Sequence, residues 1–155
     1  MPPAVTFADL RELEAHIDAQ QGRVLVAHHF ATWCTGCVDE MPLLVKLHAA
    51  LVNDPDVAFV GVSWEMFMDD SPREAVARTV GDYAAASAID FPVIVYTGAP
   101  DALIQGLGIT SGTIPHTAVY GRDGAIALRV SAPLESEADI VSLRQAIEGA
   151  KARGR

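Results

Sequence analysis

Residues 24–42 read VLVAHHFATWCTGCVDEMP and hold the only two cysteines of the chain, Cys34 and Cys37. The part before them, residues 24–30, is apolar and rich in β-formers, whereas apolar residues recur at helical spacing over residues 39–51. Two cysteines separated by two residues have the spacing of a reversible disulfide. We therefore expect this pair where a strand passes into the N-terminus of a helix.

The 155-residue length and the composition indicate one globular domain over residues 1–155. A net charge of -9 argues against a nucleic-acid or anionic-membrane partner, since those interfaces need clustered Lys and Arg. No apolar run approaches the ~20 residues of a membrane span. The start of the chain does not have the pattern of a signal peptide. As written the sequence fits a cytoplasmic protein, and it fits an extracytoplasmic one if a leader has been removed.

Strand and helix patterns alternate along the rest of the chain. A capping-box pattern at Thr6–Asp9 predicts a first helix that runs to Gly22. The further predicted elements are a strand at 24–30, a helix to about 52, a strand at 57–63, a helix from about 72 to 88, a strand at 91–96, a helix at 99–107, a hairpin of 116–120 with 125–130, and a helix at 137–150. This alternation predicts an α/β fold in which helices flank a central mixed sheet, with a C-terminal antiparallel hairpin and helix.

The cysteine pair alone could be half of a zinc site, so its surroundings decide between metal and redox chemistry. Structural zinc takes about four Cys or His ligands, and the sequence has no second CxxC motif. A strand-to-helix context with Trp33 directly before the first cysteine favours thiol chemistry instead.

Three separated motifs resemble the thioredoxin superfamily: Phe30–Cys37, Glu40–Pro42 and Thr113–Pro115. With the Phe91–Val93 strand they are similar to the bacterial TlpA/ResA-like thiol:disulfide oxidoreductases. The resemblance implies a thioredoxin-like fold and an enzyme that reduces protein disulfides without a cofactor. Its implied partners are a protein dithiol or disulfide substrate and an upstream reductant, either a thioredoxin-type protein or a membrane thiol transporter.

The resemblance also implies roles for individual residues. Cys34, at a helix N-terminus that favours an anion, is the expected nucleophile, and Cys37 is the expected resolving thiol. Thr113-Ile114-Pro115 is similar to the loop in which a cis proline faces the cysteines and the preceding backbone pairs with the substrate. Trp33, Ile114 and Pro115 are therefore expected to bind substrate. An ordinary trans X-Pro turn is the alternative for Pro115.

Two residues compete for the role of proton acceptor toward Cys37. His28 occupies the position, six residues before the first cysteine, where thioredoxins carry a buried acid, and an imidazole could act as the base. Alternatively, His28 is a core histidine satisfied by hydrogen bonds. Glu65 follows the 57–63 strand near a point where TlpA/ResA-like proteins carry an acid, and its alternative is a solvated loop carboxylate.

Two departures from the family pattern affect the expected tuning of the thiols. Thr35-Gly36 stands between the cysteines where relatives often carry proline, so the redox potential does not follow from the resemblance. Val38 stands where relatives often have Arg or Lys. With no cation in the motif, we expect a less acidic Cys34 than in strongly oxidising relatives.

A binding protein is the main alternative to an enzyme. In it, Cys34 and Cys37 would hold copper or zinc with one histidine, which could be His116, His28 or His29. A peroxidase of the peroxiredoxin type fits less well, because those enzymes do not rely on a Trp-Cys-x-x-Cys motif.

Overall fold

The computed structural model describes residues 4–154; residues 1–3, on which part of the signal-peptide expectation rests, lie outside them. The strands described are β1 (Val5–Ala8), β2 (Val24–Phe30), β3 (Val57–Ser63), β4 (Val93–Tyr96), β5 (His116–Tyr120) and β6 (Ile126–Val130). The helices described are α1 (Leu10–Asp18), α2 (Thr35–Leu51), α3 (Arg73–Ala86), α4 (Pro100–Gly106) and α5 (Glu137–Ala152), with a 3-10 turn, η1, at Glu65–Phe67.

The strands form one mixed sheet in the order β1-β4-β3-β2-β5-β6. β1, β4, β3 and β2 run parallel, whereas β5 pairs antiparallel with both β2 and β6. β2 is thus central, and all seven of its residues are buried. The predicted mixed α/β sheet with a C-terminal antiparallel hairpin is confirmed.

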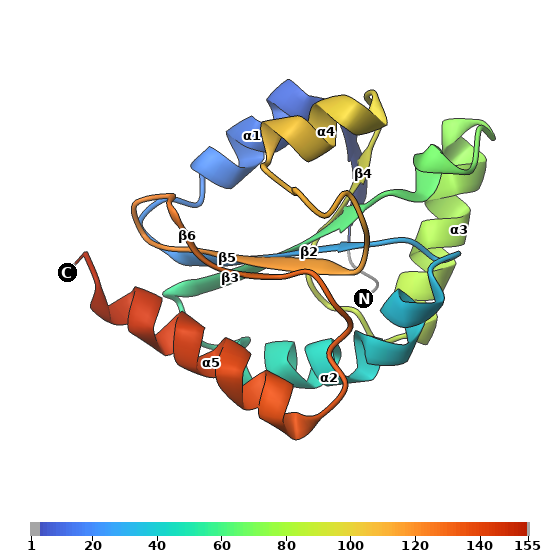
Figure 1. Ribbon diagram of the computed structural model, residues 1–155. Helices are drawn as coiled ribbons and strands as arrows, with labels where there is room; N and C mark the ends of the chain where they lie inside the picture. The colour runs from blue at the N-terminus through green and yellow to red at the C-terminus, as the bar shows by residue number, and fades with distance from the viewer. Residues whose placement is uncertain (1–3, 155) are drawn as a thin grey trace.

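Helices cover both faces of this sheet, α1 and α4 on one side and α2 and α5 on the other (Figure 1). The face under α2, α3 and α5 buries Val24, Val26 and Phe30 of β2. The opposite face buries Leu25 and Ala27. Because successive strand residues point to opposite faces, the neighbours His28 and His29 are directed into different layers.

The first predicted element is wrong at its start. Residues 5–8 form the edge strand β1 on β4, and the capping box is made by Asp9 and Glu12. Asp9 Oδ1 accepts from the Glu12 N–H, and Glu12 Oε1 accepts from the Asp9 N–H. A four-residue strand is too short to show a period. The stronger helical pattern that follows therefore led to the assignment of the helix start at Thr6.

The crossing from β2 to α2 places the cysteines at one edge of the sheet. β2 ends at Phe30, residues 31–33 form a short connection, and Cys34 is the N-cap of α2. In sheets of this kind, functional sites lie beyond the carboxyl ends of the parallel strands. Cys34 lies at that end of β2.

Candidate active site

Cys34 and Cys37 are joined by a disulfide across the first turn of α2, with their Cα atoms 5.3 Å apart. Cys34 is half-buried, and its Sγ accepts a hydrogen bond of 3.3 Å from the Cys37 N–H. Cys37 is fully buried. This N–H has no carbonyl partner within the helix and points instead at the sulfur of the more accessible cysteine. Such an environment favours a thiolate.

Glu65 holds the connection that precedes Cys34. Its Oε1 accepts from the Thr32 N–H at 2.8 Å, and its backbone carbonyl accepts from Trp33 Nε1 at 3.3 Å. Glu65 is buried, so the alternative of a solvated loop carboxylate is wrong. The structure brings Glu65 to the turn before the cysteines, with its carboxylate engaged by Thr32.

Pro115 and Pro133 lie against the turn between the cysteines. The Ile114–Pro115 peptide bond is cis. A Cβ atom added at Gly36 would lie 3.5 Å from Cδ of Pro115 and 3.1 Å from Cγ of Pro133. Gly36 therefore allows both prolines to approach closely. Ile114, next to Pro115, is half-buried.

His28 faces Glu40, a residue that sequence reasoning did not select. Nε2 of His28 lies 3.0 Å from Oε1 of Glu40, and both side chains are buried. Neither of these two atoms meets the geometry of a hydrogen bond to any partner. The remaining polar atoms are satisfied, because His28 Nδ1 meets Thr117 Oγ1 at 2.9 Å and Glu40 Oε2 accepts from the Leu134 N–H at 2.7 Å.

Glu40 could have been found from helix spacing. It lies three residues after Cys37 on α2, and residues three apart share a helix face. Both are buried on the side that faces the sheet. The pair His28–Glu40 is therefore in the same layer as the resolving cysteine expected from the sequence.

His29 and His116 meet on the opposite face of the sheet. Their ring centroids are 5.7 Å apart, and Trp64 Nε1 donates to His29 Nδ1 at 2.9 Å. Burial lowers the pKa of His29 well below its usual range and that of His116 to about 4. Both imidazoles are thus neutral near pH 7, and neither shares a face with His28.

Residues 4–154 contain no group of three or more His, Cys, Asp or Glu side chains arranged to hold a metal ion. The metal-binding alternative, with Cys34, Cys37 and His116, His28 or His29, has no preformed ligand set in this part of the chain. Among the same residues, no helix is long and apolar enough to cross a membrane.

The exposed surface around the disulfide includes two large apolar side chains, and the CxxC motif carries no cation. Trp33 is 43% exposed and Val38 is 41% exposed. Asp39 follows Val38 and is also exposed. This leaves the α2 N-terminus as the positive feature of the CxxC turn.

No protein-family model and no curated protein sequence matches the chain. Solved structures do. A thioredoxin-family thiol:disulfide interchange protein from Chlorobium tepidum shares 23% identity at a TM-score of 0.64, over 86% of this chain and 83% of that one. StoA from Bacillus subtilis shares 20% identity at a TM-score of 0.58, over 81% and 83%.

A DsbF homologue from Corynebacterium diphtheriae shares 17% identity at a TM-score of 0.64, over 86% of this chain and 75% of that one. At identities this low, the similarity supports the fold of this chain but does not assign it the substrates of these proteins. The similarity nevertheless spans most of every chain, with a CxxC disulfide at the start of α2. The protein has the thioredoxin-like fold.

Proposed function

We propose that this protein is a thiol:disulfide oxidoreductase that reduces protein disulfides through Cys34 and Cys37. The observation that carries the proposal is the disulfide between a half-buried Cys34 at a helix N-cap and a fully buried Cys37, within a thioredoxin-like fold. The names of the similar structures, which include thiol:disulfide interchange proteins, agree with this activity.

The reaction begins with both cysteines reduced. The Cys34 thiolate attacks one sulfur of the substrate disulfide, which forms a Cys34–substrate bond and releases the other substrate sulfur as a thiolate. The Cys37 thiolate then attacks Cys34 Sγ, forms the Cys34–Cys37 disulfide and releases the second substrate thiolate. The substrate disulfide thereby gains two electrons in total, one for each sulfur, and a dithiol partner must reduce the protein again.

The buried Cys37 needs a proton acceptor before it can attack. The buried His28–Glu40 pair lies in the same layer, with Nε2 and Oε1 3.0 Å apart, and an imidazole and a carboxylate are both groups that can accept a proton. Glu65 supports a different role, since its carboxylate binds the Thr32 N–H. We assign proton acceptance to the His28–Glu40 pair and orientation of the Thr32–Trp33 turn to Glu65.

Substrate binding is proposed at the surface formed by Trp33 and the Ile114–Pro115 loop. Pro115 packs close to Gly36, which places the loop beside the cysteine turn. The backbone of Ile114 would pair with an extended substrate segment whose disulfide reaches Cys34. The exposed Trp33 indole would add apolar contact.

The test is a redox titration and turnover assay on the full chain. In glutathione buffers we expect a reversible Cys34–Cys37 disulfide, and a potential near that of thioredoxin, about −270 mV, would support the reducing direction. We expect catalysed insulin reduction that Cys34→Ser abolishes, while Cys37→Ala accumulates mixed disulfides. Insulin reduction that persists in Cys34→Ser would contradict the function, and a potential near about −120 mV would contradict the reducing direction.

A further inference from the structure

The segment between α4 and cis-Pro115, residues 107–114, has no regular structure. Its N–H groups donate locally, Ile109 to the Ile104 carbonyl, Gly112 to the Ile109 carbonyl and Thr113 to Ser111 Oγ. Ile109 is buried, whereas residues 110–113 are exposed. Local bonds of this kind shape the segment but do not set its distance from the cysteines.

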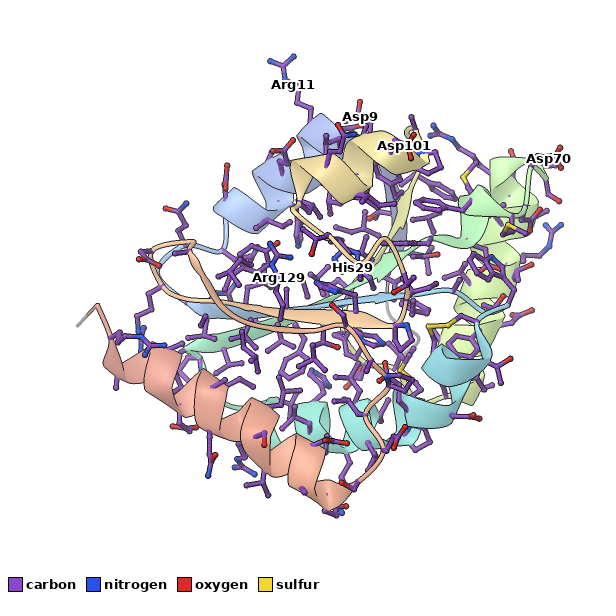
Figure 2. All side chains as sticks on the ribbon, in the orientation of Figure 1. Asp9, Arg11, His29, Asp70, Asp101 and Arg129 are labelled. Carbon is purple, nitrogen blue, oxygen red and sulfur yellow. A yellow bond between two sulfur atoms is a disulfide. The ribbon has the colours of Figure 1, made fainter. Side chains whose placement is uncertain are left out.

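Arg129 of β6 contacts the first residue of this segment and His116, the first residue of β5 after cis-Pro115. Its Nη2 donates to the Leu107 carbonyl at 2.7 Å, and its Nη1 lies 3.4 Å from Nε2 of His116. The two contacts use different nitrogens of one planar guanidinium, an arrangement that a lysine ammonium cannot reproduce. Figure 2 shows Arg129 and His29 on the same side of the sheet, between the strands and helices α1 and α4.

The contact with Arg129 determines the protonation of His116. A guanidinium nitrogen can only donate, so Nε2 of His116 must accept and Nδ1 must carry the proton. Nδ1 then donates to Ser131 Oγ at 3.1 Å. The depressed pKa of His116, about 4 because of burial and then of the nearby Arg129 and His28, keeps this neutral form populated near pH 7.

The network continues from His116 toward the cysteine turn. His29 lies opposite His116 in the β2–β5 register, and its Nδ1 accepts from Trp64 Nε1. The next residue, Glu65, holds the Thr32 N–H just before the cysteines. Polar contacts and one ring contact thus run from the Leu107 carbonyl to the turn that leads into Cys34.

We infer that Arg129 is a positioning residue for disulfide exchange, which acts through Leu107 and His116 to hold the Ile114–Pro115 loop at a fixed distance from Cys34. The inference rests on the proposed function. A protein substrate has to span both the loop and Cys34, whereas a small disulfide needs Cys34 alone. Arg129 is therefore important for protein substrates and not for the chemistry of the thiol.

The test compares the full chain with Arg129→Met, Arg129→Lys and a control, Arg144→Met, which removes the same charge from the exposed face of α5. The measurements are kcat and KM for insulin reduction and the rate constant for Cys34 with the small disulfide 5,5′-dithiobis(2-nitrobenzoate). We expect Arg129→Met to raise KM about tenfold while kcat and the small-disulfide rate stay within about twofold.

Arg129→Lys should restore KM only in part, since one ammonium cannot bridge both partners. The control should match the original chain. An unchanged KM in folded Arg129→Met would overturn the inference, as would a parallel loss of the small-disulfide rate. Should Arg129→Met fail to fold, Ser131→Ala keeps Arg129 in place and removes the Nδ1 partner of His116.

We expect Ser131→Ala to raise KM about threefold with the small-disulfide rate unchanged, and an unchanged KM there also overturns the inference. Insulin reduction by the unsubstituted protein distinguishes failure of this inference from failure of the proposed function. If the unsubstituted protein does not reduce insulin, the function itself is wrong, whereas normal turnover with insensitive variants rejects the role of Arg129 alone.

Discussion

His28 and Glu40 form a buried pair between the central strand β2 and helix α2, with Nε2 and Oε1 3.0 Å apart. His28 is 1% exposed and Glu40 is 0% exposed. Removing one partner of such a pair leaves the other side chain uncompensated in the interior, whereas removing both leaves only the Leu134 N–H and the Thr117 hydroxyl without these partners.

The first prediction concerns the stability that this pair contributes. Glu40→Met and His28→Leu should each lower the free energy of unfolding by about 3 kcal/mol, and the double variant should lose clearly less than the sum. Urea unfolding of the four proteins measures the coupling. Additive losses would show that the two side chains do not interact in the folded protein.

The second prediction distinguishes the two acidic residues near the cysteines. Glu40→Gln keeps the shape and the acceptor for Leu134 but removes the charge beside His28, so resolution of the mixed disulfide by Cys37 should slow by about tenfold or more. Glu65→Gln keeps the contact with Thr32 and should leave this step within about twofold. Rapid-mixing kinetics of preformed mixed disulfides measure both, and the reverse ranking would move the proton acceptor to Glu65.

The third prediction is a pH dependence of stability from His116. Its pKa is lowered from 6.5 to about 4 by burial, with Arg129 and His28 adding to the effect. The folded protein keeps His116 neutral while the unfolded chain takes up a proton below pH 6.5, so stability is lost as the pH falls toward 4. Between pH 7 and pH 4, His116 should lower the free energy of unfolding by about 3 kcal/mol.

His116→Gln removes this titration and should flatten the corresponding part of the stability profile. The measurement is the free energy of urea unfolding between pH 7 and pH 4 for both proteins. His29, His16 and His48, whose pKa values are also lowered by burial, remain in the variant and contribute a residual slope. Parallel profiles for the two proteins would show that His116 does not titrate differently on folding.

The fourth prediction concerns the missing cation of the CxxC motif. Val38→Arg places a positive charge on the exposed first turn of α2, next to Cys37 and near Cys34. The thiolate fraction of Cys34 at pH 7 should rise by about two- to threefold, an effect that salt weakens. Alkylation rates measure it, and Val52→Arg at the far end of α2, where Val52 is 51% exposed, is the matched control.

Much of the fold was predictable because its elements are long and periodic. β2, β3 and the β5–β6 hairpin were placed within a residue or so, since buried apolar runs bounded by turn residues are a clear signal. β1 was not found, because four residues on a sheet edge carry no period and adjoin a stronger helical pattern.

The candidate site was predictable only where its residues lie close in sequence or carry a known motif. Cys34, Cys37 and Pro115 belong to such motifs. Pro133 lies almost a hundred residues after Gly36 in the sequence, and no local sequence pattern predicts their contact. Arg129 lies in a hairpin strand and belongs to no motif, and its contact with the Leu107 carbonyl depends on the path of the 107–114 segment, which only tertiary structure defines.

The two adjacent histidines of β2 separate the two parts of this site. His28 faces the layer of Cys37 and Glu40, and His29 faces the layer of Trp64 and His116. Under the roles proposed above, changes at His28 are expected to alter proton transfer to the thiols, and changes at His29 are expected to alter the position of the substrate loop. The two sites remain electrostatically linked, because His28 adds to the lowering of the pKa of both His29 and His116. One residue inserted in β2 would exchange the two environments, so we expect the length of this strand to matter for both proposed roles.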